Sequence, residues 1–492
     1  MLTPSAHVDT FARDHLPPLD AWPPLTFPTD ITYPDRLNAA AELLDGTIAR
    51  FGADRRATVT ATVTWTYGEL AVHVNQLAHH LSDEVGLVPG NRVLIRMPNN
   101  EWLVATWLAV LKAGCVAVTT MPALRATELR TINEIAEITY SIVDDRFVDD
   151  WAAAAIGPGA VLADIVERLE KHPVTYDAVD TAGDDVAMLA FTSGTTGRPK
   201  ATMHFHRDLL AVCDTFSEHV LKPTADDLFC GSPPIGFTFG LGALVLFPMR
   251  VGAGMLLLER PTPDALVPAI REHRATILST APTAYRAMLA VPDADLSSLR
   301  RCVSAGEPLS AATWQAFYER TGLKIIDGIG STEMLHIFIS AADDDIKVGS
   351  TGTVVYGYEA CILDDDGNPV PDGTIGRLAV RGPTGCRYLS DARQSIYVQH
   401  GWNLTGDTYR RDEDGYYWYQ ARNDDMIISA GFNIAGPEVE MALMTHPDVL
   451  ECAVVGAPDP ERTMLVHAFV VVRPGSAPSA ADLQEHCRHT TI

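Results

Sequence analysis

Short apolar runs alternate with helical periodicity through the first two thirds of the chain. Residues 93–97 form an apolar run that ends at Pro98, and Asn100 after it is a typical helix N-cap. Apolar residues then recur at helical spacing, at Leu103, Trp107, Val110 and Leu111. Gly114 ends this stretch, and residues 115–119 form the next apolar run. A strand, a helix and a strand within about 30 residues predict a parallel pair joined by a crossover.

The same alternation recurs further along the chain. Strands are predicted at residues 187–191, 276–278 and 324–327, and we expect the first of them to lead through a turn into a helix. These elements predict an α/β fold, with a large N-terminal domain of mostly parallel sheets flanked by helices. The first 20 residues or so are polar and Pro-rich, and we expect them to form a surface arm.

The pattern changes after Gly349. Short strands separated by turn residues are predicted at residues 361–363, 376–380 and 416–420. A β-rich subdomain is therefore expected at about residues 349–421.

Beyond residue 424 the pattern changes again. A helix is predicted at residues 437–443 and strands at 452–456 and 466–472, which is typical of a small α+β unit. We therefore predict a large N-terminal domain over residues 1–424 and a partial, incomplete small C-terminal domain over residues 425–492.

Composition narrows the class of protein. A chain of 492 residues with 47% hydrophobic and 20% charged residues is typical of a globular enzyme. Its formal net charge is −26, and a surface that acidic repels a phosphate backbone, which argues against a nucleic-acid partner. The most apolar stretch, residues 241–258, contains Pro248 and Arg250, so it predicts buried core and no membrane partner.

The cysteines and the N-terminus bear on location. None of the eight cysteines forms a C-x-x-C pair, so zinc ribbons and thioredoxin-type sites are unsupported, and buried thiols in a reducing compartment are expected. Residues 1–15 carry charges and no apolar run, so a signal peptide is not indicated. We expect a cytoplasmic protein. A homodimer is one possible assembly, and the sequence does not determine the oligomeric state.

The most informative segment runs from Phe191 to Lys200. An apolar strand leads into a loop rich in glycine and hydroxyl residues, Thr192, Ser193, Gly194, Thr195, Thr196 and Gly197. Glycines let backbone N–H groups approach phosphates, hydroxyls donate hydrogen bonds, and Lys200 supplies charge, so the loop is suited to a polyphosphate. The spacing differs from the Walker A motif. The alternative is a flexible linker, which seldom follows an apolar strand and ends in Arg-Pro-Lys.

Three further motifs follow in order. They are the segment from Asp327 to Glu333, the triplet Thr405-Gly406-Asp407, and the stretch from Arg422 to Ile434. Together with the phosphate loop, they resemble the adenylate-forming superfamily of acyl-CoA synthetases, luciferases and peptide-synthetase adenylation domains. The resemblance extends from about residue 40 to the chain end. It implies an AMP-forming acid–thiol ligase, in which a carboxylate attacks ATP to give an acyl-adenylate and a thiol then displaces AMP.

The resemblance assigns roles to the phosphate and metal residues. Thr195, Lys200, Thr332 and Glu333 would be catalytic, and Glu333 would bind Mg²⁺, which prefers hard oxygen ligands. The alternative for Glu333 is a cap on a following helix. ATP and CoA would be co-substrates, with Mg²⁺ as cofactor.

The resemblance also assigns roles to residues that would bind the ribose, the adenine and CoA. Asp407 would accept the ribose hydroxyls, or is a turn residue, and Arg422 would bind ribose or phosphate, or forms a surface ion pair. The resemblance makes Asp424 the domain hinge and places Gly431 in the CoA channel, where the alternative is a turn glycine. The adenine site would be formed by Gly306, Glu307, Asp327 and Gly328. The alternative is that residues 304–308 are only the turn that follows a strand.

The acyl site is predicted near an aromatic loop at residues 232–240. We expect it to be formed by Phe237, Thr238, Phe239, Ala305, Ile329, Gly330 and His336. Aromatic and small residues suit a flat ring, and the loop has no acid to pair an amino-acid ammonium. The motifs resemble the benzoate–CoA and 2-aminobenzoate–CoA ligase branch, which implies a small-molecule aryl acid as substrate. For His336, as for His204 and His206, the alternative is a core or surface histidine satisfied by a backbone carbonyl, and for the last two this alternative is favoured.

One feature departs from the family pattern. The family carries a lysine in a Gly-Lys motif near its C-terminus, whereas the last lysine here is Lys347, so we expect poor adenylate formation by these 492 residues. Two alternatives to an aryl-CoA ligase stay open. One is an adenylation module that loads an aryl acid onto a carrier protein, and the other is a non-catalytic protein that binds an aryl acid or a nucleotide.

Overall fold

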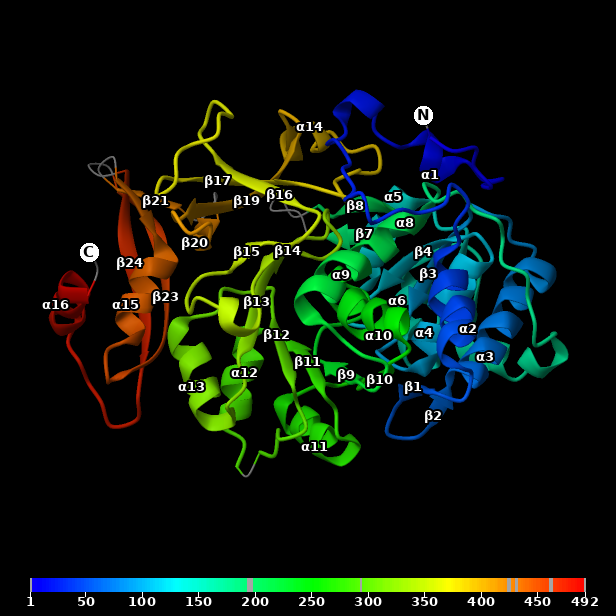
Figure 1. Cartoon of the computed structure of the whole chain (residues 1–492), viewed down its shortest axis with the longest axis horizontal. Coiled ribbons are helices and arrows are strands. Elements are labelled where there is room, and N and C mark those ends of the chain that lie inside the picture. The colour runs from blue at the N-terminus through cyan, green and yellow to red at the C-terminus, as the bar shows by residue number, and fades with distance from the viewer. Residues whose placement is uncertain are drawn as a thin grey trace. The chain divides into compact units, whose positions relative to one another are not determined.

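The computed structural model describes residues 2–192, 198–292, 294–422, 426–429, 432–459 and 463–490 (Figure 1). The chain divides into two compact units. The first comprises Met1–Val348, Val354–Glu359 and Arg381–Asn403, and the second comprises Gly349–Thr353, Ala360–Val380 and Leu404–Ile492. The domain boundary expected at residue 424 stays a prediction.

The first unit contains a six-stranded sheet in the order β6-β5-β3-β4-β7-β8. Its strands in that order are Gly159–Val161, Tyr140–Val143, Arg92–Arg96, Val116–Thr120, Val186–Thr192 and Lys200–Phe205. All neighbours are parallel except β7 and β8. The Asn100 side chain accepts a hydrogen bond from Leu103 N at 3.0 Å and caps α4 (Glu101–Lys112), which confirms the predicted strand–helix–strand unit.

A nine-stranded sheet has the order β15-β14-β13-β12-β11-β9-β10-β1-β2. Its strands in that order are Thr353–Val354, Ile337–Ser340, Ile325–Gly330, Arg301–Ser304, Ile277–Thr280, Leu228–Gly231, Gly254–Leu256, Arg56–Val59 and Thr64–Thr66. Its central strands are parallel, while β14 and β2 run antiparallel to their neighbours β13 and β1. The predicted α/β class with mostly parallel sheets is confirmed.

Helices cover these sheets. In Figure 1, α11, α12 and α13 lie beside the nine-stranded sheet, and their apolar residues form one core with it. The α-helices of the first unit are α1 Phe11–Asp14, α2 Gly46–Phe51, α3 Tyr67–His79, α4 Glu101–Lys112, α5 Ala126–Ala136, α6 Val148–Ala154, α7 Leu162–Val166, α8 His206–Val212, α9 Thr238–Leu241, α10 Phe247–Val251, α11 Pro263–His273, α12 Pro282–Leu289, α13 Ala311–Thr321 and α14 Gln394–Tyr397. Segments with π-helical hydrogen bonding are η2 Ala41–Asp45, η3 His80–Glu84, η6 Cys213–Leu221 and η7 Gly242–Leu246.

The β-rich region expected after Gly349 is a five-stranded sheet with the order β16-β17-β19-β18, in which β20 also pairs with β19. The strands are β16 Glu359–Leu363, β17 Ile375–Arg381, β18 Val398–Gln399, β19 Trp402–Arg411 and β20 Tyr417–Arg422.

The α+β region that follows has the sheet order β22-β21-β24-β23. Its elements are β21 Met426–Ser429, β22 Phe432–Ala435, α15 Gly436–Met444, β23 Val449–Asp459, β24 Thr463–Val472 and α16 Ala480–Thr490.

Two local expectations are wrong. The strand at 187–191 is followed by strand β8, which pairs antiparallel with it, and only then by helix α8. The N-terminal segment is also no loose surface arm, because Ala12 is fully buried and Arg13 forms an ion pair with Asp185 at 3.0 Å. An Asp that is buried on folding needs such a cation, and the charge pattern of the segment alone does not reveal its partner.

Candidate functional site

Lys200 and Glu333 lie next to each other in the first unit. Lys200 begins strand β8, and its Nζ lies 2.9 Å from Glu333 Oε1. Tyr388 joins the pair, because its hydroxyl donates to Glu333 Oε1 at 2.5 Å and accepts from Lys200 Nζ. The Lys200 ammonium also lies 4.4 Å from the centre of the Tyr388 ring. The three side chains form a small charged cluster that joins the predicted phosphate loop to the second motif.

Glu333 is fixed by its turn. The element that follows it is strand β14 and not a helix, so the helix-cap alternative is wrong. Within the turn, Ser331 accepts a hydrogen bond from Met334 N at 3.2 Å, and Thr384 donates to Met334 O at 2.8 Å. Leu335 has a positive φ of 70°, a strained value that brings the chain back into β14. The carboxylate is therefore presented by a rigid loop.

A buried network lies beneath the cluster. His204 Nε2 donates to the carbonyl of Thr332 at 2.8 Å, and Arg387 forms an ion pair with Asp208 in the interior. Burial lowers the pKa of His204 to about 3, so the ring is neutral and carries its proton on Nε2. His206 is also fully buried, and its Nδ1 accepts from Ala39 N at 3.1 Å. Both histidines lie in the core, but only His204 is satisfied by a backbone carbonyl as expected, and through it His204 also supports the turn that carries Glu333.

Most of the predicted phosphate loop, from Ser193 to Gly197, lies outside the described residues. Its flanks are held close together, because Thr192 and Lys200 pair across β7 and β8. Arg393 donates to the carbonyls of Arg198 and Pro199 at 3.0 and 3.2 Å. The described residues on either side of the loop are therefore held together by β7, β8 and Arg393.

The predicted adenine residues lie at the ends of two neighbouring parallel strands, where Ser304 and Asp327 stand side by side. The Ser304 hydroxyl and Asp327 Oδ1 are both shielded from solvent, and neither makes a hydrogen bond of good geometry among the described residues. Burial raises the pKa of Asp327 to about 7, although the Ser304 hydroxyl is close enough to act in the opposite direction and lower it. Gly306 has φ 89° and Glu307 accepts from the Thr283 hydroxyl at 3.2 Å. A carboxylate with an unused oxygen can accept a hydrogen bond from a ligand amino group.

His336 lies in an aromatic cage. The ring centres of Phe216, Phe239 and Phe247 lie 5.3, 5.7 and 4.5 Å from the imidazole centre. Neither imidazole nitrogen makes a hydrogen bond of good geometry within the described part of the chain, and burial lowers the pKa of His336 to about 3, although the nearby Phe239 backbone acts in the opposite direction. The ring is therefore a neutral, buried group whose donor and acceptor are not well satisfied by the described residues.

The other residues predicted to form the acyl site differ in their exposure to solvent. Phe237 is 42% exposed at the start of α9, while Thr238 and Ala305 are buried. Gly328 and Gly330 allow β13 to pair tightly with β14, because a Cβ at Gly328 would lie 2.7 Å from Ile337. Ile329, between them, is half-buried and pairs with Ile339.

The second unit brings Asp407 and Arg422 together. They are directly opposed in the register of β19 and β20, and a Cβ at Gly406 would lie 3.4 Å from the Arg422 guanidinium. Residues 405–407 lie within strand β19 and not in a turn, so the turn alternative for Asp407 is wrong, and the Thr405 hydroxyl accepts a hydrogen bond from Asp407 N at 3.1 Å. Asp407 of the third motif and Arg422, the first residue of the fourth motif, are therefore neighbours on paired strands. The hinge residue Asp424 and the channel residue Gly431 lie outside the described residues.

Several residues of the site were missed by the sequence analysis. Tyr388 follows the buried Arg387 in a segment without a recognisable motif, and only the fold brings it to Glu333. Phe216 and Phe247 belong to runs that indicate core. For these two residues, helical spacing gave no signal that separates a core ring from one lining a ligand site.

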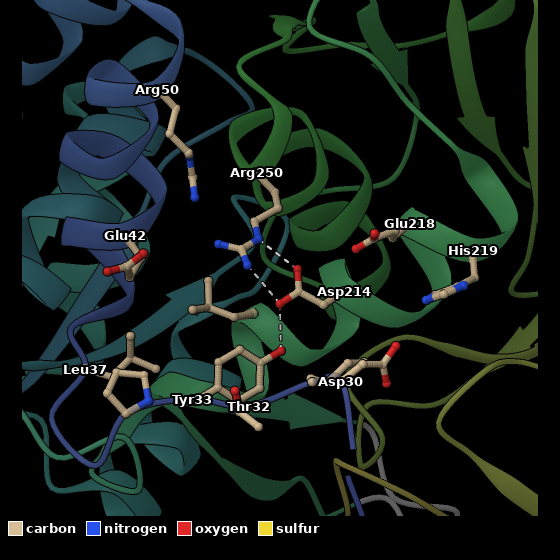
Figure 2. A pocket seen from close by; sticks show the side chains of 13 residues that line it. Asp30, Thr32, Tyr33, Leu37, Glu42, Arg50, Asp214, Glu218, His219 and Arg250 are labelled. Carbon is tan, nitrogen blue, oxygen red and sulfur yellow. Dashed lines mark hydrogen bonds and ion pairs between the residues drawn. The ribbon is translucent and has the colours of Figure 1, made fainter. Parts of the chain in front are cut away.

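A separate cavity of about 370 Å³ lies in the first unit (Figure 2). Figure 2 shows Arg250 directed at Asp214, which it binds at 2.8 and 2.9 Å, while the Tyr33 hydroxyl donates to the same carboxylate at 2.7 Å. None of the predicted site residues lines this cavity, so it is distinct from the cluster around Glu333.

Similarity to solved structures extends over nearly the whole chain. A structure described as the anthranilate CoA ligase AuaEII in complex with anthranoyl-AMP has a TM-score of 0.88, is 33% identical, and is matched over 94% of this chain and 92% of that chain. A benzoate CoA ligase from Burkholderia xenovorans LB400 has a TM-score of 0.85 and is 31% identical, with 92% and 93% of the two chains covered. No described helix is long and apolar enough to cross a membrane.

The sequence comparisons agree with these structures. The benzoate–CoA ligase of Thauera aromatica is 32% identical over 482 residues, which is 94% of this chain and 92% of the relative. The model of the AMP-binding enzyme family matches residues 44–388, and that of the AMP-binding enzyme C-terminal domain matches residues 438–491. The chain therefore belongs to the AMP-binding enzyme family, which confirms the resemblance to the adenylate-forming superfamily.

Proposed function

We propose that this protein is an AMP-forming aryl-CoA ligase. It activates an aromatic carboxylic acid with ATP to an aryl-adenylate and then forms the thioester with CoA. The best substrate candidates are 2-aminobenzoate and benzoate. The observation that carries the aromatic assignment is the neutral His336 within three phenyl rings, and the relatives with benzoate and anthranilate in their names support it.

Lys200 and Glu333 are proposed to handle the phosphate charge. The Lys200 ammonium forms an ion pair with Glu333 at 2.9 Å. A bound polyphosphate would compete with Glu333 for this ammonium. Thr192 stands opposite Lys200 and borders the loop whose residues Ser193, Gly194, Thr195, Thr196 and Gly197 are proposed phosphate donors. Thr332 adjoins Glu333 and is proposed to donate to the α-phosphate.

The residues present fit a magnesium ion. Tyr388 and Lys200 interact with Glu333 Oε1, and no described residue donates a hydrogen bond to Oε2. One carboxylate oxygen together with substrate phosphates and water is the usual ligand set of Mg²⁺. When bound there, the ion would neutralise phosphate charge and polarise a phosphoryl oxygen.

Tyr388→Phe should lower the rate of pyrophosphate release. The hydroxyl contacts both Lys200 and Glu333, and a hydrogen bond to a charged group contributes about 1.5–3 kcal/mol, which is roughly 10- to 100-fold in rate. The matched control is Tyr318→Phe, at a tyrosine that is 38% exposed on α13. Equal rates for both variants and the unmodified chain would refute the positioning role.

Asp327 is proposed to accept the adenine amino group, with Gly306, Glu307 and Gly328 forming the wall. Its pKa of about 7 predicts a pH dependence. Above pH 7 the carboxylate is ionised and is a strong acceptor, whereas below pH 7 it is protonated. The KM for ATP should therefore rise as the pH falls from 8 to 6, and Asp327→Asn should remove this dependence. An equally pH-dependent KM in the variant would contradict the assignment.

The same carboxyl makes a prediction about stability. Its folded-state pKa lies above the value of 3.8 expected on unfolding, so the folded chain binds the proton more tightly. Its contribution to the free energy of unfolding therefore falls as the pH rises from about 4 to 7.

The second unit contributes the proposed ribose site. Asp407 would accept ribose hydroxyls, and Arg422 opposite it would bind ribose or phosphate. By family resemblance Asp424 is the proposed hinge and Gly431 lines the proposed CoA channel.

One assay tests the function. Pyrophosphate release is measured with benzoate, 2-aminobenzoate, salicylate and octanoate, each with and without CoA. Although adenylate formation is expected to be slow, we expect faster pyrophosphate release with the planar acids than with octanoate, and thioester formation with free CoA. Faster turnover with octanoate would refute the aryl assignment, and adenylate formation without transfer to CoA would favour a carrier-protein acceptor.

A further inference from the structure

Two histidines and a glutamate meet at the far end of α3, outside the site described above. His80 and Glu84 are the first and last residues of η3, the π-helical continuation of α3. His172 directly follows the 3₁₀ turn Leu169–Lys171 and lies against the same face. All three belong to the first unit, and none is near in sequence to a predicted site residue.

The three side chains aim their polar atoms at one point. His80 Nδ1 lies 3.1 Å and His172 Nε2 lies 3.2 Å from Glu84 Oε2, and all three atoms lie within 4.8 Å of one another. Zinc–ligand bonds of about 2.0–2.2 Å in a tetrahedron place neighbouring ligand atoms roughly 3.3–3.6 Å apart. Small side-chain adjustments would therefore bring the three atoms into a zinc coordination sphere.

The neighbouring groups fix the ligands. Arg168 donates to the other carboxylate oxygen, Glu84 Oε1, at 2.9 Å and leaves Oε2 to face the histidines. Hydrogen bonds of this kind orient metal ligands, although the Arg168 charge also opposes a cation. Of the nearby groups, His79 is engaged by Asp83 and by the carbonyl of Thr175, so it does not compete for the position.

The ligands differ in how far they reach solvent. The His80 side chain is only 3% exposed, so the fold holds its ring in place. Glu84 is 37% exposed, so an ion and a completing water have a path from solvent.

We propose that His80, Glu84 and His172 bind a divalent transition-metal ion of the zinc class, with water as the fourth ligand. The two imidazoles favour zinc over magnesium, which takes oxygen ligands. The ion would tie the end of α3 to the segment at residues 169–172 and so stabilise the fold locally. It would be separate from the magnesium ion proposed at Glu333.

The test is a zinc titration of the whole chain, prepared without a polyhistidine tag and stripped of metal with a chelator. We expect one zinc ion per chain by calorimetry, a zinc-dependent rise in Tm, and the visible absorption of tetrahedral cobalt when Co²⁺ is used as probe. His172→Ala should weaken zinc binding at least roughly tenfold and abolish the Tm rise. Glu84→Gln, at an exposed side chain, should do the same with little effect on the metal-free Tm.

The matched control is His273→Ala, on α11 and outside the cluster, which should bind zinc like the unmodified chain. The proposal is overturned if the chain binds no zinc, or if His172→Ala and Glu84→Gln, folded by their metal-free Tm, bind it as tightly as the control. In that case the three side chains form a hydrogen-bonded group only.

Discussion

Glu333→Gln should reduce ATP-dependent pyrophosphate release by at least roughly 10²-fold. The substitution removes the negative charge that neutralises Lys200 at 2.9 Å, and it removes the anionic oxygen proposed to bind Mg²⁺. Losing one group positioned at the reacting charge typically costs about 10²–10³ in rate. Gln keeps the size of the side chain and can still accept the hydrogen bond from Tyr388, so the turn should stay in place. Initial rates at saturating ATP measure the effect.

A stability measurement separates catalysis from folding in this variant. Removing one partner of a buried ion pair destabilises by about 3–5 kcal/mol when the other charge is left uncompensated. Here the loss should be smaller, because the Lys200 ammonium keeps its hydrogen bond to Tyr388 and its contact with the Tyr397 ring at 5.3 Å. We expect a modest fall in Tm and retained secondary structure.

Glu319→Gln is the matched control, since Glu319 is exposed on α13. Its rate and its magnesium dependence should equal those of the unmodified chain. Near-normal turnover of Glu333→Gln, or an unchanged response to magnesium concentration, would refute the assigned role of Glu333.

The strands of the fold were predictable because they are buried on both faces. Residues 93–97 and 115–119 are apolar runs without alternation, which is the pattern of parallel strands covered by helices. The observed strands Arg92–Arg96 and Val116–Thr120 differ from the expected ones by one residue at each end. The helix between them was marked by its Asn100 cap and by Gly114, whose φ is 71°.

The error after the phosphate loop has a physical cause. Residues 200–205 are half polar in sequence, and the helix begins only at His206. Both His204 and Thr202 are fully buried on strand β8, although their polarity argues against a buried strand. His204 is accommodated because the Thr332 carbonyl accepts its proton at 2.8 Å, and this contact spans 128 residues. A partner so distant cannot be deduced from local pattern.

The candidate site was predictable as a set of motifs but not as a geometry. The opposition of Asp407 and Arg422 depends on the register of β19 and β20, which includes an irregularity after Thr408. The direct ion pair between Lys200 and Glu333 joins residues 133 apart in the sequence, and Tyr388, which contacts both, comes from a third distant segment. Sequence spacing indicates which side chains are suited to bind a phosphate. Tertiary packing decides which of them form hydrogen bonds and ion pairs with one another.

Gly242 shows how closely the acyl site is packed. It begins η7, and a Cβ at this position would lie 2.3 Å from His336 Cδ2 and 2.7 Å from His336 Nε2. The imidazole cannot easily retreat, because Phe216, Phe239 and Phe247 surround it. The missing side chain of Gly242 is therefore what leaves room for the histidine in its present rotamer. Any larger residue must displace the ring or the helix backbone.

Gly242→Ala should therefore impair use of the aryl acid more than binding of ATP. Forcing one extra carbon into a packed core costs about 1–3 kcal/mol of stability, and a displacement of about 1 Å at a reacting centre costs roughly 10²-fold in rate. We expect kcat/KM for the best planar acid to fall by about that factor, with the KM for ATP nearly unchanged. Gly236→Ala, in the segment just before α9, is the matched control, because its Cβ would lie 3.6 Å from Met121, an ordinary contact. If Gly242→Ala keeps full activity and the same preference among acids, His336 does not face the substrate and the proposed acyl site is wrong.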